Sequence, residues 1–131
     1  MSNLELKLIS PNKEYFNGEV EMVVVPGEEG DFSALKEHAP LVTYLRPGKI
    51  QIYQKEKLEL EFFAGSGFVK ILNNNCLILV DYIKTIKEID KNKTEKQISD
   101  INEKIRLEAN STLLDKLLVK KRILEEEYLI S

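Results

Sequence analysis

Residues 26–48 are the segment of the chain richest in proline and glycine, and they restrict its fold more than any other segment. They hold three of the four prolines, three of the six glycines and the only histidine. Proline lacks an amide donor, and glycine adopts backbone conformations that other residues avoid. A segment interrupted this often is typical of short strands joined by tight turns.

Residues 1–84 predict an antiparallel β-sandwich or barrel. Leu4, Leu6 and Leu8 alternate with charged residues, as in a half-buried strand. Further strands are expected at Met22–Val25, Leu41–Leu45, Phe68–Leu72 and Cys76–Val80, with turns at Asn17-Gly18, Lys55-Glu56-Lys57 and Asn73-Asn74-Asn75. Strands this short, without long helical crossovers, favour this class over a parallel α/β sheet.

The pattern changes to a helical one after a charged linker, residues 85–93. Thr94 and Gln97 have the spacing of a capping box, which predicts a helix start at Thr94. Residues 94–131 then predict a two-helix hairpin interrupted at Asn110-Ser111-Thr112, with apolar residues at helical spacing: Ile98, Ile101, Ile105, Leu113, Leu114, Leu117, Leu118, Leu124 and Tyr128.

The apolar stripes of this hairpin have two interpretations. Helices of about 15 residues are marginal alone, so the stripes must pack on something. They pack either on each other and on the sandwich, or, after detachment, on a partner. A modest packing area would place the two states close in energy, as a switch requires.

Charge and cysteine content exclude several classes of protein. The net charge is −3, and neither residues 1–84 nor residues 85–131 carry a basic excess, which argues against nucleic acid. Cys76 is the only cysteine and lies in an apolar run, as a buried small hydrophobe would. The N-terminus lacks the features of a secretory signal, and no apolar run approaches the roughly 20 residues that span a bilayer. We therefore expect a soluble intracellular chain whose membrane association goes through a partner.

Candidate catalytic groups are few. His38 alone cannot build a histidine metal site, and Ser33, His38 and Asp31 lie within one loop without the context of a nucleophile. Gly65-Ser66-Gly67 is too short for a phosphate loop and more typical of strands that bend or approach closely. Glu28, Glu29 and Asp31 would bind a cation or form a solvated acidic tip. The chain is therefore not expected to be an enzyme.

Two motifs resemble the epsilon subunit of bacterial F-type ATP synthase. The first is V-x-G-x-E-G-x-F-x-x-L-x-x-H-A-P-L-x-T-x-L-R-P-G-x-I, which runs without a gap from Val25 to Ile50. The second is G-G-F-x-x-[VI], present as Gly65-Ser66-Gly67-Phe68-Val69-Lys70-Ile71 with one glycine displaced. With the N-terminal strand and the C-terminal hairpin, the resemblance covers essentially the whole chain.

The resemblance implies a non-catalytic subunit of the rotating central stalk in a proton-translocating ATP synthase. Its sandwich would bind the gamma subunit and the c-ring, and couple rotation to the catalytic head. Its hairpin would inhibit ATP hydrolysis by extending along gamma to the alpha and beta subunits. The expected location is peripheral, at the cytoplasmic face of the bacterial inner membrane.

The same resemblance assigns interface residues. Asp31 and His38 correspond to the loop that meets the polar loops of the c-ring, where charge would give register more than affinity. Alternatively, His38 is structural and bonds to its own loop before Pro40. Four basic residues of the second helix are candidates for contact with the catalytic head, or form a solvated face: Lys116, Lys120, Lys121 and Arg122.

A regulatory ATP site is also implied, although no cofactor is required. Members that sense ATP carry I/L-D-x-x-R-A before the hairpin, and this chain has Ile89-Asp90-Lys91-Asn92-Lys93-Thr94. Lys93 replaces an arginine and cannot repeat its bidentate contacts, although Arg122 could add a basic contact. The alternative is that Asp90 starts the hairpin region and Thr94 caps the helix.

Two other functions remain open from the residues themselves. One is a β-sandwich that binds a sugar or small molecule, although the chain lacks tryptophan and most Phe and Tyr fall on predicted strands. The other is a small hydrolase, which the single histidine disfavours. Purification distinguishes the three functions. A stalk subunit should co-purify with gamma, a binding module with its ligand, and a hydrolase should show turnover.

Overall fold

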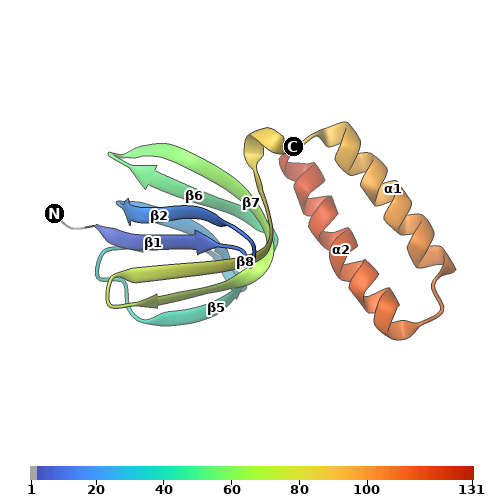
Figure 1. Ribbon diagram of the computed structural model, residues 1–131, viewed down its shortest axis with the longest axis horizontal. Helices are drawn as coiled ribbons and strands as arrows, with labels where there is room; N and C mark the ends of the chain where they lie inside the picture. The colour runs from blue at the N-terminus through green and yellow to red at the C-terminus, as the bar shows by residue number, and fades with distance from the viewer. Residues whose placement is uncertain (1–2) are drawn as a thin grey trace. The chain divides into compact units, whose positions relative to one another are not determined.

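A computed structural model describes residues 3–131 of the chain. The chain divides into two compact units, one of strands up to Thr85 and one of helices from Ile86 to Ser131 (Figure 1). The strands of the described part are β1 (Leu4–Ile9), β2 (Glu14–Val20), β3 (Met22–Gly27), β4 (Gly30–Leu35), β5 (Leu41–Leu45), β6 (Gly48–Gln54), β7 (Lys57–Leu72) and β8 (Asn75–Thr85). A 3-10 turn (Ile86–Glu88), α1 (Lys91–Leu107) and α2 (Ser111–Ile130) follow. The predicted class, a β-sandwich followed by a helical hairpin, is confirmed.

The sheet folds on itself through its longest strand, β7. The strand order is β2-β1-β8-β7-β5-β3-β4, and β6 pairs with both β3 and β7. The first part of β7 pairs with β6 and the second part with β5, while β8 follows β7 along its other edge. The pairs are antiparallel except for β1 and β8, which run parallel. The sequence predicted a strand at Phe68–Leu72, and in the structure this segment continues the residues that pair with β6 as one long strand, β7.

Gly67 sits at the bend of β7. The register with β8 shifts between Ala64 and Gly67, and Gly67 has φ +149°, a conformation that residues with a Cβ rarely adopt. A Cβ built at Gly67 would lie 2.1 Å from the Leu79 carbonyl oxygen. The predicted role of Gly65-Ser66-Gly67, to let strands bend and approach, is confirmed at Gly67.

The core of the sandwich comes from the alternate, inward positions of its strands. Leu4, Leu6 and Leu8 of β1 are buried, as their spacing predicted. They pack in one cluster with residues of the other strands, including Cys76, Ile78 and Val80 of β8. Burial raises the pKa of the Cys76 thiol to about 12, so this thiol is protonated at neutral pH and acts as the small hydrophobe that was predicted.

The expected turn at Asn17-Gly18 is wrong. Both residues lie inside β2, opposite Lys7 and Leu6 of β1. The turn falls earlier, where Ser10 N donates to Lys13 O at 2.8 Å across Pro11 and Asn12. Proline fixes φ at a value that suits the second position of such a turn. A proline–asparagine turn therefore outcompetes the Asn-Gly signal, which is accommodated in an edge strand.

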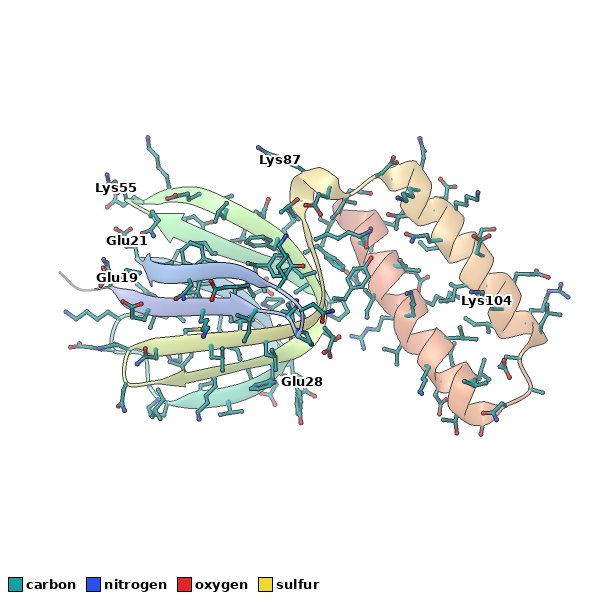
Figure 2. The ribbon with its side chains drawn as sticks, viewed as in Figure 1. Glu19, Glu21, Glu28, Lys55, Lys87 and Lys104 are labelled. Atoms are coloured by element: carbon teal, nitrogen blue, oxygen red, sulfur yellow. The ribbon has the colours of Figure 1, made fainter. Side chains whose placement is uncertain are left out.

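The other two turns form where they were predicted. Lys55 and Glu56 have φ of 51° and 65°, and Asn73 and Asn74 have φ of 51° and 61°. Positive φ at both central residues gives the tight hairpin turn whose twist matches that of its strands. The Glu21 carboxylate accepts from Glu56 N at 3.0 Å. Figure 2 shows Glu21 and Lys55 at one end of the sandwich and Glu28, after β3, towards the other.

The helical unit begins earlier than the capping-box pattern predicted. Asp90 is the N-cap of α1, and its carboxylate accepts from Asn92 N at 3.0 Å and Lys93 N at 3.2 Å. Thr94 lies inside the helix and caps nothing. Aspartate caps a helix at least as well as threonine, so the start at Asp90 prevails and leaves Thr94 available for another contact.

The two helices lie side by side as an antiparallel hairpin (Figure 1). Their connection is well capped, because Asn110 Oδ1 accepts from Leu113 N at 3.1 Å and Glu108 Oε1 from Asn110 N at 3.0 Å. No helix within residues 3–131 combines the length and the apolar character needed to cross a membrane.

Candidate functional site

Asp31 takes part in an ion pair at the end of the β3–β4 hairpin. Arg46 Nη2 donates to Asp31 Oδ1 at 2.7 Å, and the two side chains are 35% and 64% exposed. The backbone holds Arg46 in place, since its amide donates to Pro26 O at 3.0 Å. Asp31 is therefore a largely solvated charge that Arg46 orients, and an exposed pair of this kind contributes little to the stability of the fold.

His38 lies beside Asp31 at the same end. Both side chains line one depression of about 340 Å³, and the His38 ring centroid is 6.0 Å from that of Phe32. His38 Nδ1 lies 2.6 Å from the carbonyl oxygen of Ala39. A carbonyl only accepts, so Nδ1 donates, and Nε2 is left for another contact. The loop bond expected of a structural histidine is present, and it leaves one ring nitrogen for a partner.

The outer face of β5, β7, β8 and β1 carries apolar side chains in register. Tyr44 pairs with Phe68, Phe68 with Leu79, and Leu79 with Ile9. We call these four residues the apolar row. Side chains of directly opposed residues lie about 5 Å apart on one face of a sheet. The apolar row is therefore a continuous ridge across four strands.

A second row runs parallel to the first and mixes apolar with basic residues. Val42 pairs with Lys70, Lys70 with Leu77, and Leu77 with Lys7. Val42 and Tyr44 are 67% and 68% exposed. A contiguous exposed apolar surface with a charged margin marks a site of protein contact. This face is therefore a candidate docking surface.

The sequence prediction missed this face. Alternation assigns the apolar residues of a strand to the core and the others to solvent. In Leu41–Leu45 four of five residues are apolar, so the strand shows no alternation and Val42 and Tyr44 were not distinguished from core. An apolar residue at an outward position is the signal, and recognising it requires the register.

The residues of the degenerate ATP motif lie around the start of α1. Asp90 is occupied as the N-cap, Lys93 is exposed, and Ile89 is half-buried. Arg122 is exposed on α2, about 7.5 Å along the helix axis from Glu127, which contacts Thr94. The structure thus groups Ile89, Asp90 and Lys93 and places Arg122 on a different helix.

The basic residues of α2 do not share one face. Lys116 and Lys120 are four residues apart and point the same way. Lys120, Lys121 and Arg122 are consecutive, so their directions differ by about 100° each. Lys121 is half-buried and the other three are exposed. Only Lys116 and Lys120 form a pair that one partner surface can meet.

The acidic, histidine and cysteine side chains of residues 3–131 are dispersed over the fold. No group of three or more His, Cys, Asp or Glu side chains there is arranged to hold a metal ion. Glu28, Glu29 and Asp31 line the depression beside His38, at the solvated end of the β3–β4 hairpin.

The fold and these surfaces define a class of protein: a β-sandwich with a candidate docking face and an appended helical hairpin. Comparison with known protein families gives the same β-sandwich class. The model of the ATP synthase Delta/Epsilon chain β-sandwich domain matches residues 3–86. The chain belongs to this family, among the epsilon chains of bacterial F-type ATP synthases.

Individual relatives are similar over different lengths. The ATP synthase epsilon chain of Rhodospirillum rubrum is 43% identical over 77 residues, 59% of this chain and 58% of that one. That of Maricaulis maris is 37% identical over 102 residues, 78% of this chain and 76% of that one. The chain thus spans little more than half of the Rhodospirillum rubrum protein in its alignment.

Solved structures share the fold at low sequence identity. A chain in the cryo-EM structure of the Euglena gracilis mitochondrial ATP synthase has a TM-score of 0.79 at 17% identity, over 96% of this chain and 79% of that chain. A chain in the central stalk and c-ring structure from Tetrahymena thermophila has a TM-score of 0.62 at 17% identity, over 95% of both chains.

Proposed function

We propose that the chain is a non-catalytic rotor subunit of a proton-translocating F-type ATP synthase. In this role it couples rotation of the c-ring to the catalytic head through the gamma subunit. Family membership supports the assignment, and the solved structures of similar fold are parts of such complexes. The chain would act at the cytoplasmic face of the bacterial inner membrane, held there by its partners and without an active site of its own.

The apolar row is the observation that supports docking to gamma. It crosses four strands, so it is rigid and preorganised for binding, and binding costs little ordering. Its exposed aromatic residue, Tyr44, is of a type enriched at the centres of protein interfaces. Lys7 and Lys70 in the second row favour a gamma surface that is apolar with acidic groups at its margin.

The end of the sandwich with Asp31 and His38 is proposed to meet the c-ring. The Asp31–Arg46 pair and the Nε2 of His38 offer polar groups to a partner at this end. Such a contact gives orientation more than affinity, which suits a surface whose main attachment lies elsewhere.

The principal test is co-expression with the cognate gamma subunit, followed by size-exclusion chromatography. A stable one-to-one complex is the expected result. A folded chain that elutes alone would overturn the assignment and favour the alternative, a β-sandwich that binds a small ligand.

The hairpin is proposed to inhibit ATP hydrolysis, with Lys116 and Lys120 meeting acidic surfaces of the alpha and beta subunits. Deleting residues 91–131 should raise ATP hydrolysis by the assembled enzyme several-fold and leave assembly intact, because the strands form a compact unit without it. Steady-state hydrolysis by purified complexes measures this. Replacing Lys116 and Lys120 by glutamine should give part of the same increase. Unchanged hydrolysis after the deletion would remove the inhibitory role and keep the coupling role.

Binding of regulatory ATP to the chain is a separate proposal from the inhibitory role of the hairpin. Ile89, Asp90, Lys93 and Arg122 are its residues, and use of the Asp90 carboxylate as a helix cap competes with any contact to a nucleotide.

A further inference from the structure

Lys70 has apolar neighbours on all four sides of the candidate docking face. Directly opposite it, on β5 and β8, lie Val42 and Leu77. Two residues away along β7, on the same face, lie Phe68 and Leu72. Val42 and Leu72 are 67% and 43% exposed, so these apolar neighbours are open to a partner. Lys70 is therefore an isolated cation within an apolar surface.

Lys70 is not neutralised by another side chain of residues 3–131. It is exposed, and the ion pairs in this part of the chain do not include it. Lys7, the other lysine of the second row, differs because Glu5 lies two residues away on the same face of β1. Strand β8 separates Glu5 from β7 and Lys70. In the free chain, water therefore solvates the ammonium group of Lys70.

A depression of about 520 Å³ opens on this face beside Lys70. Its lining combines aliphatic side chains, asparagine side chains and the two lysines: Leu72, Leu77, Asn73, Asn75, Lys7 and Lys70. Glu5 lines it on the β1 side. Lysine and asparagine side chains both donate hydrogen bonds, and those from lysine to a carboxylate are charge-assisted. The depression thus offers space and donors for an acidic side chain of a partner.

A partner that covers the four apolar neighbours also removes water from Lys70. Taking an ammonium group out of water costs free energy unless an opposite charge and hydrogen bonds replace its hydration. A neutral or basic partner surface would leave the cation uncompensated, whereas a carboxylate in the depression would compensate it. A partner that binds this face tightly is therefore expected to be acidic opposite Lys70.

We propose that Lys70 selects the gamma subunit by pairing with one carboxylate of gamma, an aspartate or glutamate side chain that enters the depression between Lys7 and Lys70. This pairing rests on the proposed docking to gamma, and it names the chemistry of the gamma surface at one position. Lys70 thereby acts as a specificity residue, because a surface with a neutral or basic group at that position would leave a desolvated cation unpaired.

The test is titration calorimetry of the full chain and purified gamma with the Lys70→Met variant. Methionine keeps an unbranched apolar side chain and removes the charge. Binding should weaken by about 30-fold or more, because the carboxylate of gamma is left desolvated without a partner. Lys70→Arg keeps a cation at this position and should recover most of the affinity.

Lys57→Met is the matched control. Lys57 is exposed at the start of β7, where the strand pairs with β6, and so lies outside the apolar surface around Lys70. Its loss should leave the dissociation constant within about threefold, as for most residues outside a hot spot. Circular dichroism checks that each variant is folded, which is expected because both lysines are exposed.

The direction of the change decides the outcome. A Lys70→Met variant that binds gamma as tightly as the original chain, or more tightly, would overturn the pairing, since removing an uncompensated cation from an apolar interface strengthens binding. Equal weakening by Lys70→Met and Lys57→Met would also overturn it, because net charge alone would then act. If the original chain does not bind gamma at all, the proposed function fails as well, and this result is distinct from the other two.

Discussion

Replacing Gly67 by alanine is expected to lower the free energy of unfolding by about 2–6 kcal/mol, the sum of backbone strain and overpacking. The new Cβ would lie 2.1 Å from the Leu79 carbonyl oxygen and 2.9 Å from Val80 Cα, both of them backbone atoms of β8. Backbone atoms cannot swing away as the end of a side chain can. The strands must therefore separate at the bend where β7 leaves β6 and joins β5.

Gly30→Ala is the control for this prediction. Gly30 also has an unfavourable φ, +138°, but a Cβ there would meet nothing within 4 Å. The loss should be about 1–3 kcal/mol, from backbone strain alone. Denaturant unfolding monitored by circular dichroism and tyrosine fluorescence measures both variants. Equal losses would show that the close approach of β7 to β8 contributes nothing.

Tyr44→Asp is expected to weaken binding of the gamma subunit about 100-fold, as loss of an aromatic hot-spot residue does. Tyr44 is 68% exposed at the end of the apolar row, so a charge there is solvated in the free chain and desolvated in the complex. Folding should change little, because the position already faces water. Titration calorimetry or surface plasmon resonance with purified gamma gives the ratio of dissociation constants.

Leu58→Asp is the matched control for the docking face. Leu58 is an exposed apolar residue of β7, 45% exposed, in the part of the strand that pairs with β6. It lies outside the apolar row and should leave the dissociation constant within about threefold, as for most residues outside a hot spot. Equal weakening by both changes would mean that Tyr44 acts through general surface charge, and a Tyr44→Asp variant that binds gamma normally would exclude the apolar row as the interface.

Local signals predicted the strands and turns well where one interaction dominates. The alternation of Leu4, Leu6 and Leu8 holds because burial of one face decides the register of a strand. The turns predicted at Lys55-Glu56 and Asn73-Asn74 form because the strands on either side pair with each other, which leaves the chain only two residues in which to reverse. The turn predicted at Asn17-Gly18 does not form, because the chain turns at Pro11-Asn12 instead. The cap predicted at Thr94 is not used, because Asp90 caps the helix four residues earlier.

The candidate sites divide in the same way. The sequence pointed to Asp31 and His38, and the structure places both in one depression, with Arg46 as the partner of Asp31. It gave no indication of the apolar row or of the Thr94–Glu127 contact. Each of these joins residues distant in the chain, and nothing within a local window distinguishes Tyr44 from a core residue or Glu127 from a solvated acid.

By itself, the sequence determined the class of fold, the order of its two units and the family, because hydrophobic period, turn residues and a long motif are local properties of the chain. The tertiary structure alone decided which outward residues meet across strands, which glycine carries a close backbone approach, and which polar groups join the two helices. Those features depend on strand register and helix pairing. Register and pairing are set by the burial of the whole core, which no single segment encodes.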